Sequence, residues 1–182
     1  VASVYSEDMF GIVGETFTFP VELKQRTEEI TWNKDKDKVA ERDGQKPPTY
    51  FGPLQGRSML KENGNLTIFN LEKSDAGTYE LHYWGSTKEG SLKFILAVLD
   101  PPSEPKISHS VDGDNLVLNC TSDFQRPVTY TWKLSNDDEH SRQSQEFSIP
   151  IKNIDATKKA TCFITFSQTE KSSEISLIQC IS

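Results

Sequence analysis

The feature that most constrains this chain is the alternation of apolar and polar residues in short runs. Apolar side chains occupy every second position in such runs, as at Phe17, Phe19 and Val21. Because successive side chains of a strand point to opposite faces, this period of two predicts strands with one buried face. Turn-forming segments separate the runs at the spacing typical of a β-sandwich, and no long helical periodicity competes. The expected fold class is all-β.

Three prolines interrupt this pattern near the middle of the chain, within Asp100–Pro105. Each proline lacks an N–H group to donate, so the segment cannot lie in a central strand. The 182 residues are enough for two domains of roughly 90 to 100 residues each. We therefore expect two tandem β-sandwiches, with a first domain over 1–99, a linker over 100–105 and a second domain over 106–182.

The charge balance argues against several partners. Lys and Arg together number 20, Asp and Glu number 27, and the net charge is -7. A chain that binds nucleic acid or an acidic membrane needs a basic face, so another protein is the expected partner.

No motif of a common enzyme class is present. The sequence lacks Gly-x-Ser-x-Gly, a P-loop, a Gly-rich dinucleotide turn and His-Glu-x-x-His. Its three histidines, His82, His109 and His140, are far apart and without the spacing of metal ligands. We expect no enzymatic activity, no metal or other cofactor and no small-molecule substrate.

Several features indicate an extracellular fragment. The chain contains no run of 18 apolar residues and no signal peptide, which predicts a mature soluble ectodomain. Sequons at Asn65 and Asn119 are candidate glycosylation sites. The three cysteines, Cys120, Cys162 and Cys180, fit an oxidising compartment if two of them pair, which leaves one thiol over.

Two motifs of the first half resemble the variable-type immunoglobulin domain. Gly14–Val21 resembles its B strand, and Asp75–Leu81 resembles the Asp-x-Gly-x-Tyr-x-Cys motif at the corner between strands E and F. The two disulfide cysteines of that domain type are replaced here by Val21 and Leu81. We expect this aliphatic pair, beneath Trp32, to hold the sheets together by apolar burial of about 1.5 to 3 kcal/mol per side chain.

The same resemblance implies two polar contacts at the corner. Tyr79 should hydrogen-bond the corner backbone, and Arg57, placed like the D-strand arginine of that domain type, should pair with Asp75 across the floor of the sandwich. Both residues are assigned structural roles.

The whole chain resembles the lymphocyte adhesion family of the immunoglobulin superfamily, which includes the T-cell erythrocyte receptor and its ligands. A V-set domain without the inter-sheet disulfide, followed by a C2-set domain, is typical of that family. The stretch Trp32–Glu41 is similar to strands C and C′ of one ligand member, and Gly64–Leu71 and Tyr130–Trp132 are further similarities.

The resemblance implies a disulfide between Cys120 and Cys162, from strand B to strand F of the second domain. A second disulfide is usual in the family, and Cys180 fits its G-strand member, but His109 stands at the expected position of its partner. Cys180 is therefore expected to be a free or intermolecular thiol. The alternative pairing of Cys162 with Cys180 would leave Cys120 unpaired opposite Trp132.

In the family, the exposed face of strands G, F, C and C′ of the membrane-distal first domain binds the partner. Carried over position by position, the implied contact residues are Lys34, Lys36, Asp37, Lys38, Glu41, Asp43, Glu80 and His82. Asn33 and His82 differ from the charged residues usual there. Trp84 beside this patch either anchors a partner or packs on its own loop. The alternative role of the charge-dense segment 34–43 is a solvated edge that prevents sheet-to-sheet aggregation.

The resemblance implies a cell-surface adhesion ligand, membrane-anchored at the plasma membrane in its full-length form. Its first domain would bind an erythrocyte-receptor-type molecule on T cells and natural killer cells and support T-cell costimulation at the immune synapse. Recognition through mixed charges implies weak, rapidly exchanging and salt-sensitive binding. The chain itself is expected to be a monomer. The alternative is a homophilic or heterophilic receptor of the signalling lymphocytic activation group, or a viral mimic of such a molecule.

Overall fold

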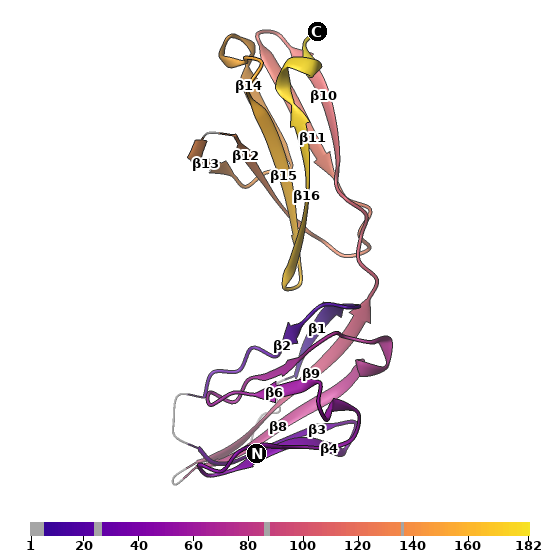
Figure 1. Cartoon of the computed structure of the whole chain (residues 1–182), viewed down its shortest axis with the longest axis vertical. Helices are drawn as coiled ribbons and strands as arrows, with labels where there is room; N and C mark the ends of the chain where they lie inside the picture. The colour runs from indigo at the N-terminus through magenta and orange to yellow at the C-terminus, as the bar shows by residue number, and fades with distance from the viewer. Residues whose placement is uncertain (1–5, 24–26, 86–87, 136) are drawn as a thin grey trace. The chain divides into compact units, whose positions relative to one another are not determined.

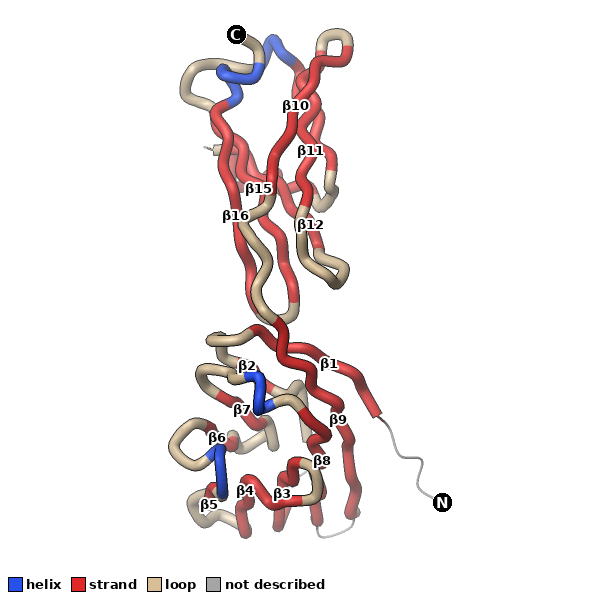
Figure 2. Tube along the Cα trace, turned by 90° about the vertical axis from the view of Figure 1, so that its right-hand side faces the viewer, coloured by secondary structure: helices blue, strands red, loops and turns tan. Residues whose placement is uncertain are grey.

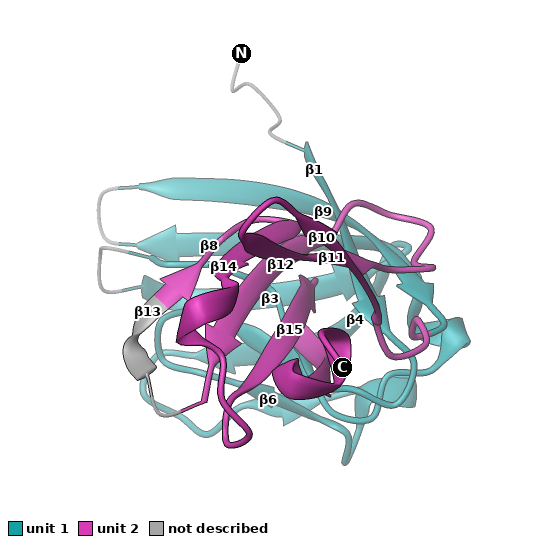
Figure 3. Ribbon diagram, turned by 90° about the horizontal axis from the view of Figure 1, so that it is seen from above, with its two compact units in different colours: residues 1–100 teal, residues 101–182 magenta. Residues whose placement is uncertain are grey.

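The computed structural model describes residues 6–23, 27–85, 88–135 and 137–182, with the backbone alone for 137–140 (Figure 1). The chain divides into two compact units, Val1–Asp100 and Pro101–Ser182, which Figure 3 colours separately. Strands dominate both units and the helical segments are short 3-10 turns, so the predicted all-β class is confirmed.

The first unit is a sandwich of two sheets. Its larger sheet has six strands in the order β1-β9-β8-β3-β4-β5, and its smaller sheet has three in the order β2-β7-β6. The strands are β1 (Ser6–Ile12), β2 (Phe17–Thr18), β3 (Thr27–Lys34), β4 (Asp37–Asp43), β5 (Thr49–Tyr50), β6 (Ser58–Leu60), β7 (Leu66–Ile68), β8 (Gly77–Gly85) and β9 (Glu89–Leu99). Strand β1 runs parallel to β9, as Figure 2 shows, and the other neighbours are antiparallel.

The two sheets are held together by a continuous apolar core. Val21 and Leu81, which replace the disulfide cysteines, are 3% and 0% exposed, so both are buried as predicted. The ring of Phe19 lies 4.7 Å from that of Tyr79 and 5.1 Å from that of Trp32. Since such ring contacts add to the free energy of area burial, an aromatic cluster supplements the aliphatic pair that the sequence indicated.

The B strand is shorter than the predicted Gly14–Val21 segment. Only Phe17–Thr18 forms a regular ladder, because Pro20 has no N–H to donate. Pairing nevertheless continues irregularly beyond β2, where the Val21 N–H donates to Oδ1 of Asn65 at 3.1 Å. An asparagine side chain thus takes the place of a backbone carbonyl.

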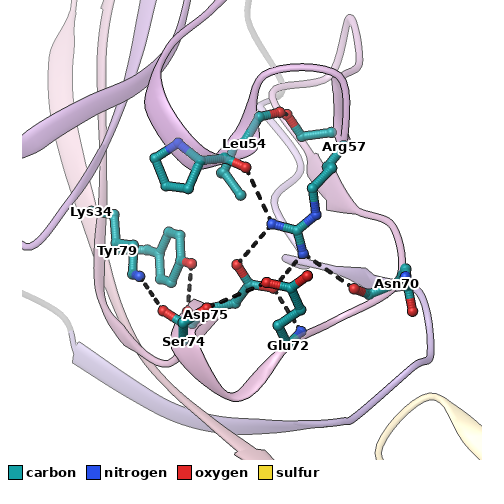
Figure 4. Close-up of polar contacts among 10 residues, drawn as sticks. Lys34, Leu54, Arg57, Asn70, Glu72, Ser74, Asp75 and Tyr79 are labelled. Atoms are coloured by element: carbon teal, nitrogen blue, oxygen red, sulfur yellow. Dashed lines mark hydrogen bonds and ion pairs between the residues drawn. The ribbon is translucent and has the colours of Figure 1, made fainter.

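A polar network closes the corner between β7 and β8 (Figure 4). Arg57 donates to both carboxylate oxygens of Asp75, at 3.3 and 2.8 Å, and to the carbonyls of Pro53 and Asn70. The Asp75 side chain is only 2% exposed, whereas that of Arg57 is 24% exposed. The Tyr79 hydroxyl donates to the Asp75 carbonyl at 2.6 Å. Both contacts predicted for this corner are confirmed.

The second unit is also a two-sheet sandwich, with sheet orders β10-β11-β14 and β13-β12-β15-β16. Its strands are β10 (Lys106–Asp112), β11 (Asn115–Thr121), β12 (Thr129–Leu134), β13 (Asp137–Arg142), β14 (Glu146–Pro150), β15 (Lys159–Phe166) and β16 (Thr169–Ser176). The short 3-10 turns of the chain are η1 (Gly52–Leu54), η2 (Lys73–Asp75), η3 (Ile151–Asn153) and η4 (Leu177–Cys180).

A disulfide joins the two sheets of this unit, from Cys120 on β11 to Cys162 on β15. Trp132 is buried on the neighbouring strand β12, opposite Cys162, and its indole N–H donates to the Gln145 carbonyl at 3.1 Å. Cys180 is a free, buried thiol at the end of η4, and burial raises its pKa. His109 is exposed on β10.

Removing the cation of the corner network should destabilise the first unit. Arg57→Met leaves the buried Asp75 carboxylate without its counter-ion, and such a loss costs about 3 kcal/mol of unfolding free energy. The control is Lys46→Met, because Lys46 and Asp43 are 79% and 78% exposed and 4.0 Å apart. Urea denaturation should show a large loss for the first variant only, and equal effects would contradict the structural role of Arg57.

The same corner predicts an alkaline limit to stability. Burial, with smaller contributions from the Asp75 and Asp35 carboxylates, raises the pKa of Tyr79 above its usual range near 10. In the unfolded chain this phenol ionises near pH 10, while in the folded unit it stays neutral. Stability should therefore be fully present below about pH 10 and fall as the pH rises further.

Tyr79→Phe removes this titration, so the urea midpoint of the first unit should depend less on pH between about 9 and 11 than in the parent chain. It should also cost about 1 kcal/mol at neutral pH through the lost hydrogen bond. Tyr130→Phe in the second unit is the control and should keep the parent pH dependence. An unchanged alkaline slope in Tyr79→Phe would refute this assignment.

Candidate functional site

The outer face of the six-stranded sheet presents polar side chains from four neighbouring strands. On β4, β3 and β8, the alternate positions Ala40, Trp32 and Leu81 are 0% exposed and face the core. Because side chains alternate along each strand, the residues between them point to the other side of the sheet. On β4 the pairing is irregular, with both Val39 and Ala40 buried, and this places Lys38 opposite Asn33 on the outer side as well. We call this surface the charged face. Its residues are Glu29, Thr31, Asn33, Lys38, Glu41, Asp43, Glu80, His82, Trp84, Glu89, Ser91 and Lys93.

The strand register arranges these residues in three rows, each running across β4, β3, β8 and β9. The acidic row is Asp43, Glu29, Trp84 and Glu89. The middle row is Glu41, Thr31, His82 and Ser91. The basic row is Lys38, Asn33, Glu80 and Lys93. Directly opposed side chains of adjacent strands lie about 4.5 to 5.5 Å apart at Cβ, so each row is a set of close neighbours.

The residues predicted as partner contacts fall in three places. The charged face contains six of them: Lys38, Glu41, Asp43, Glu80, His82 and Trp84. Lys36 and Asp37 lie at the hairpin between β3 and β4 and are exposed. Lys34 lies opposite the buried Tyr79, on the core side of the sheet, and its ammonium group donates to the Ser74 carbonyl at 2.5 Å (Figure 4).

Alternation along β3 places Lys34 on the same side as the buried Trp32, and the strand then ends in a tight hairpin. Asp35 and Lys36 both have positive φ, 47° and 79°, which is typical of a two-residue turn. The Asp35 backbone N–H donates to the Thr78 carbonyl at 2.8 Å, and its carboxylate accepts the Thr78 N–H at 2.9 Å. Asp35 therefore fixes the hairpin to β8.

Part of the charge on this face is already paired within the sheet. Lys38 and Glu41 form an ion pair at 2.7 Å, with their side chains 47% and 35% exposed. Nε2 of His82 lies 3.3 Å from the Glu80 carboxylate. Pairs this exposed contribute little to folding stability, and their side chains can exchange partners at low cost.

Trp84 is 38% exposed and stacks on His82 of its own strand, with the ring centroids 6.3 Å apart. It points out of the charged face between two carboxylate residues, Glu29 and Glu89. One side of the ring is therefore supported by His82, and part of its surface remains open to solvent.

Sequence reasoning missed Glu29, Glu89 and Lys93. Glu89 and Lys93 lie on β9, where outward positions alternate with Leu92 and the buried Phe94. This alternation was visible in the sequence and could have identified both residues. Their position beside Trp84 and Glu80 depends on the register between β8 and β9, which the local pattern does not specify.

The opposite sheet has a different character. Met59 on β6 and Phe69 after β7 are 47% and 41% exposed, so large apolar side chains are exposed there.

The two sequons occupy different units. Asn65 lies near β2, where it accepts a hydrogen bond from the Val21 N–H. The threonine of the same sequon, Thr67, is 4% exposed and shares a hydrogen bond with the Thr18 hydroxyl at 2.8 Å. Asn119 alternates with buried residues on β11. Neither sequon belongs to the charged face.

No group of three or more His, Cys, Asp or Glu side chains among the described residues could hold a metal ion. The side chain of His140, one of the three histidines considered above, lies outside the described residues. No helix in the described ranges is long and apolar enough to cross a membrane.

No family model matches the chain. It is 27% identical to human lymphocyte function-associated antigen 3 (LFA-3) over 185 residues, which cover 98% of this chain and 72% of that protein. It is 33% identical to horse T-cell surface antigen CD2 over 113 residues, which cover 57% of this chain but only 30% of that relative.

A crystal structure of the CD2-binding domain of CD58 (LFA-3) matches with a TM-score of 0.51 and 25% identity. The match covers 95% of this chain and 98% of that one. The ligand member whose strands C and C′ resemble the stretch Trp32–Glu41 is LFA-3. The comparisons confirm the resemblance at the level of the immunoglobulin superfamily and of the LFA-3 and CD2 relatives within it.

Proposed function

We propose that this chain docks on a partner through the charged face of its first unit. The proposal starts from the chain as an immunoglobulin-superfamily cell-adhesion molecule related to LFA-3 and CD2, without enzymatic function. The observation that carries the proposal is the set of three rows in which four strands present exposed ionic side chains beside one exposed tryptophan. Ionic groups on one sheet face suit recognition by a surface of complementary pattern.

The alternative role of these charges as edge protection fits only part of the charged face. Edge protection concerns the outermost strands of a sheet, which have unpaired N–H and C=O groups. In the six-stranded sheet the outermost strands are β1 and β5, whereas the charged face is built on β9, β8, β3 and β4. Strands β3 and β8 have a paired strand on each side, so their outward charges are available for another role, whereas β4 pairs with β5 only at Ala40 and Glu41.

The partner we propose is a CD2-type receptor on a T cell or natural killer cell. The similar solved structure is described as a CD2-binding domain, and the present chain aligns with 98% of it. In this proposal, the first unit is the membrane-distal ligand-binding domain, the second unit is membrane-proximal, and the full-length protein is anchored at the plasma membrane. Adhesion of this kind would support T-cell costimulation at the immune synapse.

The mechanism is discrimination by charge pattern. A matching receptor pairs with Glu29, Glu89 or Lys93, and a mismatched one meets like charges or leaves desolvated ions unpaired. Exposed ion pairs contribute only about 0 to 1 kcal/mol each, so single contacts should be weak and exchange quickly. Many copies on two opposed membranes would raise the total strength and still let the cells separate.

We also propose that Asn65 and Asn119 carry N-linked glycans. Neither residue belongs to the charged face, so neither glycan would be attached to the proposed docking surface. Glycosylation would modify Nδ2 of Asn65. The other side-chain atom, Oδ1, accepts the hydrogen bond from the Val21 N–H.

Charge reversal on the face tests the proposal. Lys38→Glu should weaken binding to human and horse CD2 ectodomains at least about tenfold, because one attraction becomes a repulsion. Raising the salt concentration should weaken binding of the parent chain as well. Surface plasmon resonance at two salt concentrations measures both effects.

The matched control is Lys61→Glu, which makes the same charge change at an exposed residue of the first unit outside the charged face. We expect it to bind like the parent chain. If Lys61→Glu lost binding and Lys38→Glu kept it, the face would be wrongly assigned. If the parent chain bound neither CD2 ectodomain, the receptor assignment would be wrong.

A further inference from the structure

Strand β10 of the second unit is the outermost strand of its sheet and has β11 as its neighbour (Figure 1). Six of its seven residues are exposed. An edge strand presents a row of unpaired N–H and C=O groups, which natural proteins usually block with prolines, bulges or inward-pointing charges. Strand β10 contains no proline, pairs with β11 without a register shift, and has its lysine and its aspartate at the two ends. It is therefore an open edge to which another strand can add.

The hydrogen bonds of β11 show which residues of β10 face the free edge. The Cys120 N–H donates to the Gln145 carbonyl at 3.0 Å, on the side of β11 away from β10. Because bonded and non-bonded pairs alternate along an antiparallel ladder, Leu118 and Leu116 also direct their backbone groups to β14. The residues of β10 opposite these three direct theirs to the free edge, and they are Ile107, His109 and Val111.

The side chains of the same three residues lie at the rim of the core. Their partners on β11 are all 0% exposed, so the three side chains are on the core side of the sheet. Val111 is nevertheless 56% exposed, the highest value among the exposed large apolar side chains of the described residues, and His109 is exposed as well. The core is thus uncovered along this edge.

The sequence of β10 is complementary to itself when two copies run antiparallel. A twofold axis through His109, perpendicular to the sheet, pairs residue i of one copy with residue j of the other and j with i. The resulting pairs are Lys106 with Asp112, Ile107 with Val111, Ser108 with Ser110, and His109 with itself. Opposite charges meet at both ends, and the exposed Val111 meets an apolar residue.

The backbone groups match in the same register. The residues that face the free edge are paired only with one another, so three bonded pairs form, and each exchanges two N–H to C=O hydrogen bonds. A shift by one residue would place bonded groups of one copy opposite residues that already bond β11. The two imidazoles at the axis can share a hydrogen bond, because a neutral imidazole has one donor and one acceptor.

We propose that β10 is a contact between two copies of this chain, which pair edge to edge and antiparallel about His109. The contact lies in the second unit, uses no residue of the charged face and does not depend on the proposed function. Seven residues per copy is few beside the roughly 20 to 30 of a stable interface, and the net charge of -7 on each copy opposes association. The chain should therefore be a monomer in dilute solution, as expected from its sequence, and pair at high concentration.

Disulfide trapping on the whole chain tests the register. Ser108 of one copy should face Ser110 of the other across a non-bonded pair, with Cα atoms about 4.5 Å apart, which suits a disulfide. A mixture of Ser108→Cys and Ser110→Cys chains should form a mixed disulfide dimer in a glutathione redox buffer. Each variant alone should form several times less, because like positions lie about 7 to 8 Å apart, beyond the reach of a disulfide. The free thiol of Cys180 is present in every sample, so it cannot explain a product specific to the mixture.

A charge placed at the edge tests the contact without cysteines. Val111→Lys should remove self-association in sedimentation velocity runs up to about 1 mM protein, where a millimolar dissociation constant becomes measurable. The matched control is Met59→Lys, which replaces another exposed apolar residue outside β10 and should associate like the parent chain. Both changes make the chain less negative, so general repulsion alone would predict stronger association for both. Circular dichroism and thermal melting confirm that each variant is folded.

Three results would overturn the inference: no self-association of the parent chain, undiminished association of Val111→Lys, or a mixture of the cysteine variants that cross-links no better than its components. Binding to CD2 ectodomains separates this contact from the proposed function. Val111→Lys should bind them like the parent chain, and a parent chain that pairs through β10 but binds neither ectodomain would count against the proposed receptor alone.

Discussion

The fold of the first unit depends on burying one side of the six-stranded sheet without a disulfide. Trp32 and Leu81, both fully buried, hold β3 and β8 against the smaller sheet, and the indole of Trp32 donates to the Gly64 carbonyl at 3.0 Å. A slip of one residue in either strand would expose these side chains, so burial fixes the register. The same register places His82 beside Thr31 on the outer side. The core therefore determines which polar residues become neighbours.

Much of this architecture could be predicted from the sequence, because period-two alternation and the corner motif are local signals. Tyr79, Arg57 and Asp75 were assigned correctly since their roles follow from a recurrent corner geometry. The composition of the charged face could be predicted only partly. The turn at Asp35 and the irregular pairing of β3 with β4 after Trp32 shift side chains between the two faces, and neither feature follows from alternation alone.

The face combines two properties that suit reversible adhesion. Its ionic groups are exposed and partly paired within the sheet, so a partner replaces existing weak contacts instead of satisfying buried ions. Its charge also changes sign from one end to the other. A receptor with the reverse pattern would find opposite charges at both ends of the face, and one with the same pattern would meet like charges.

The central claim is that docking uses the outer side of the six-stranded sheet. Chemical-shift mapping of the isotope-labelled chain during titration with a CD2 ectodomain tests it most directly. We predict that the perturbed amides cluster along the middle row, at Thr31, His82 and Ser91, with the indole signal of Trp84 shifted as well. Perturbations confined to Met59, Phe69 and their neighbours on the smaller sheet, or to the second unit, would contradict the account.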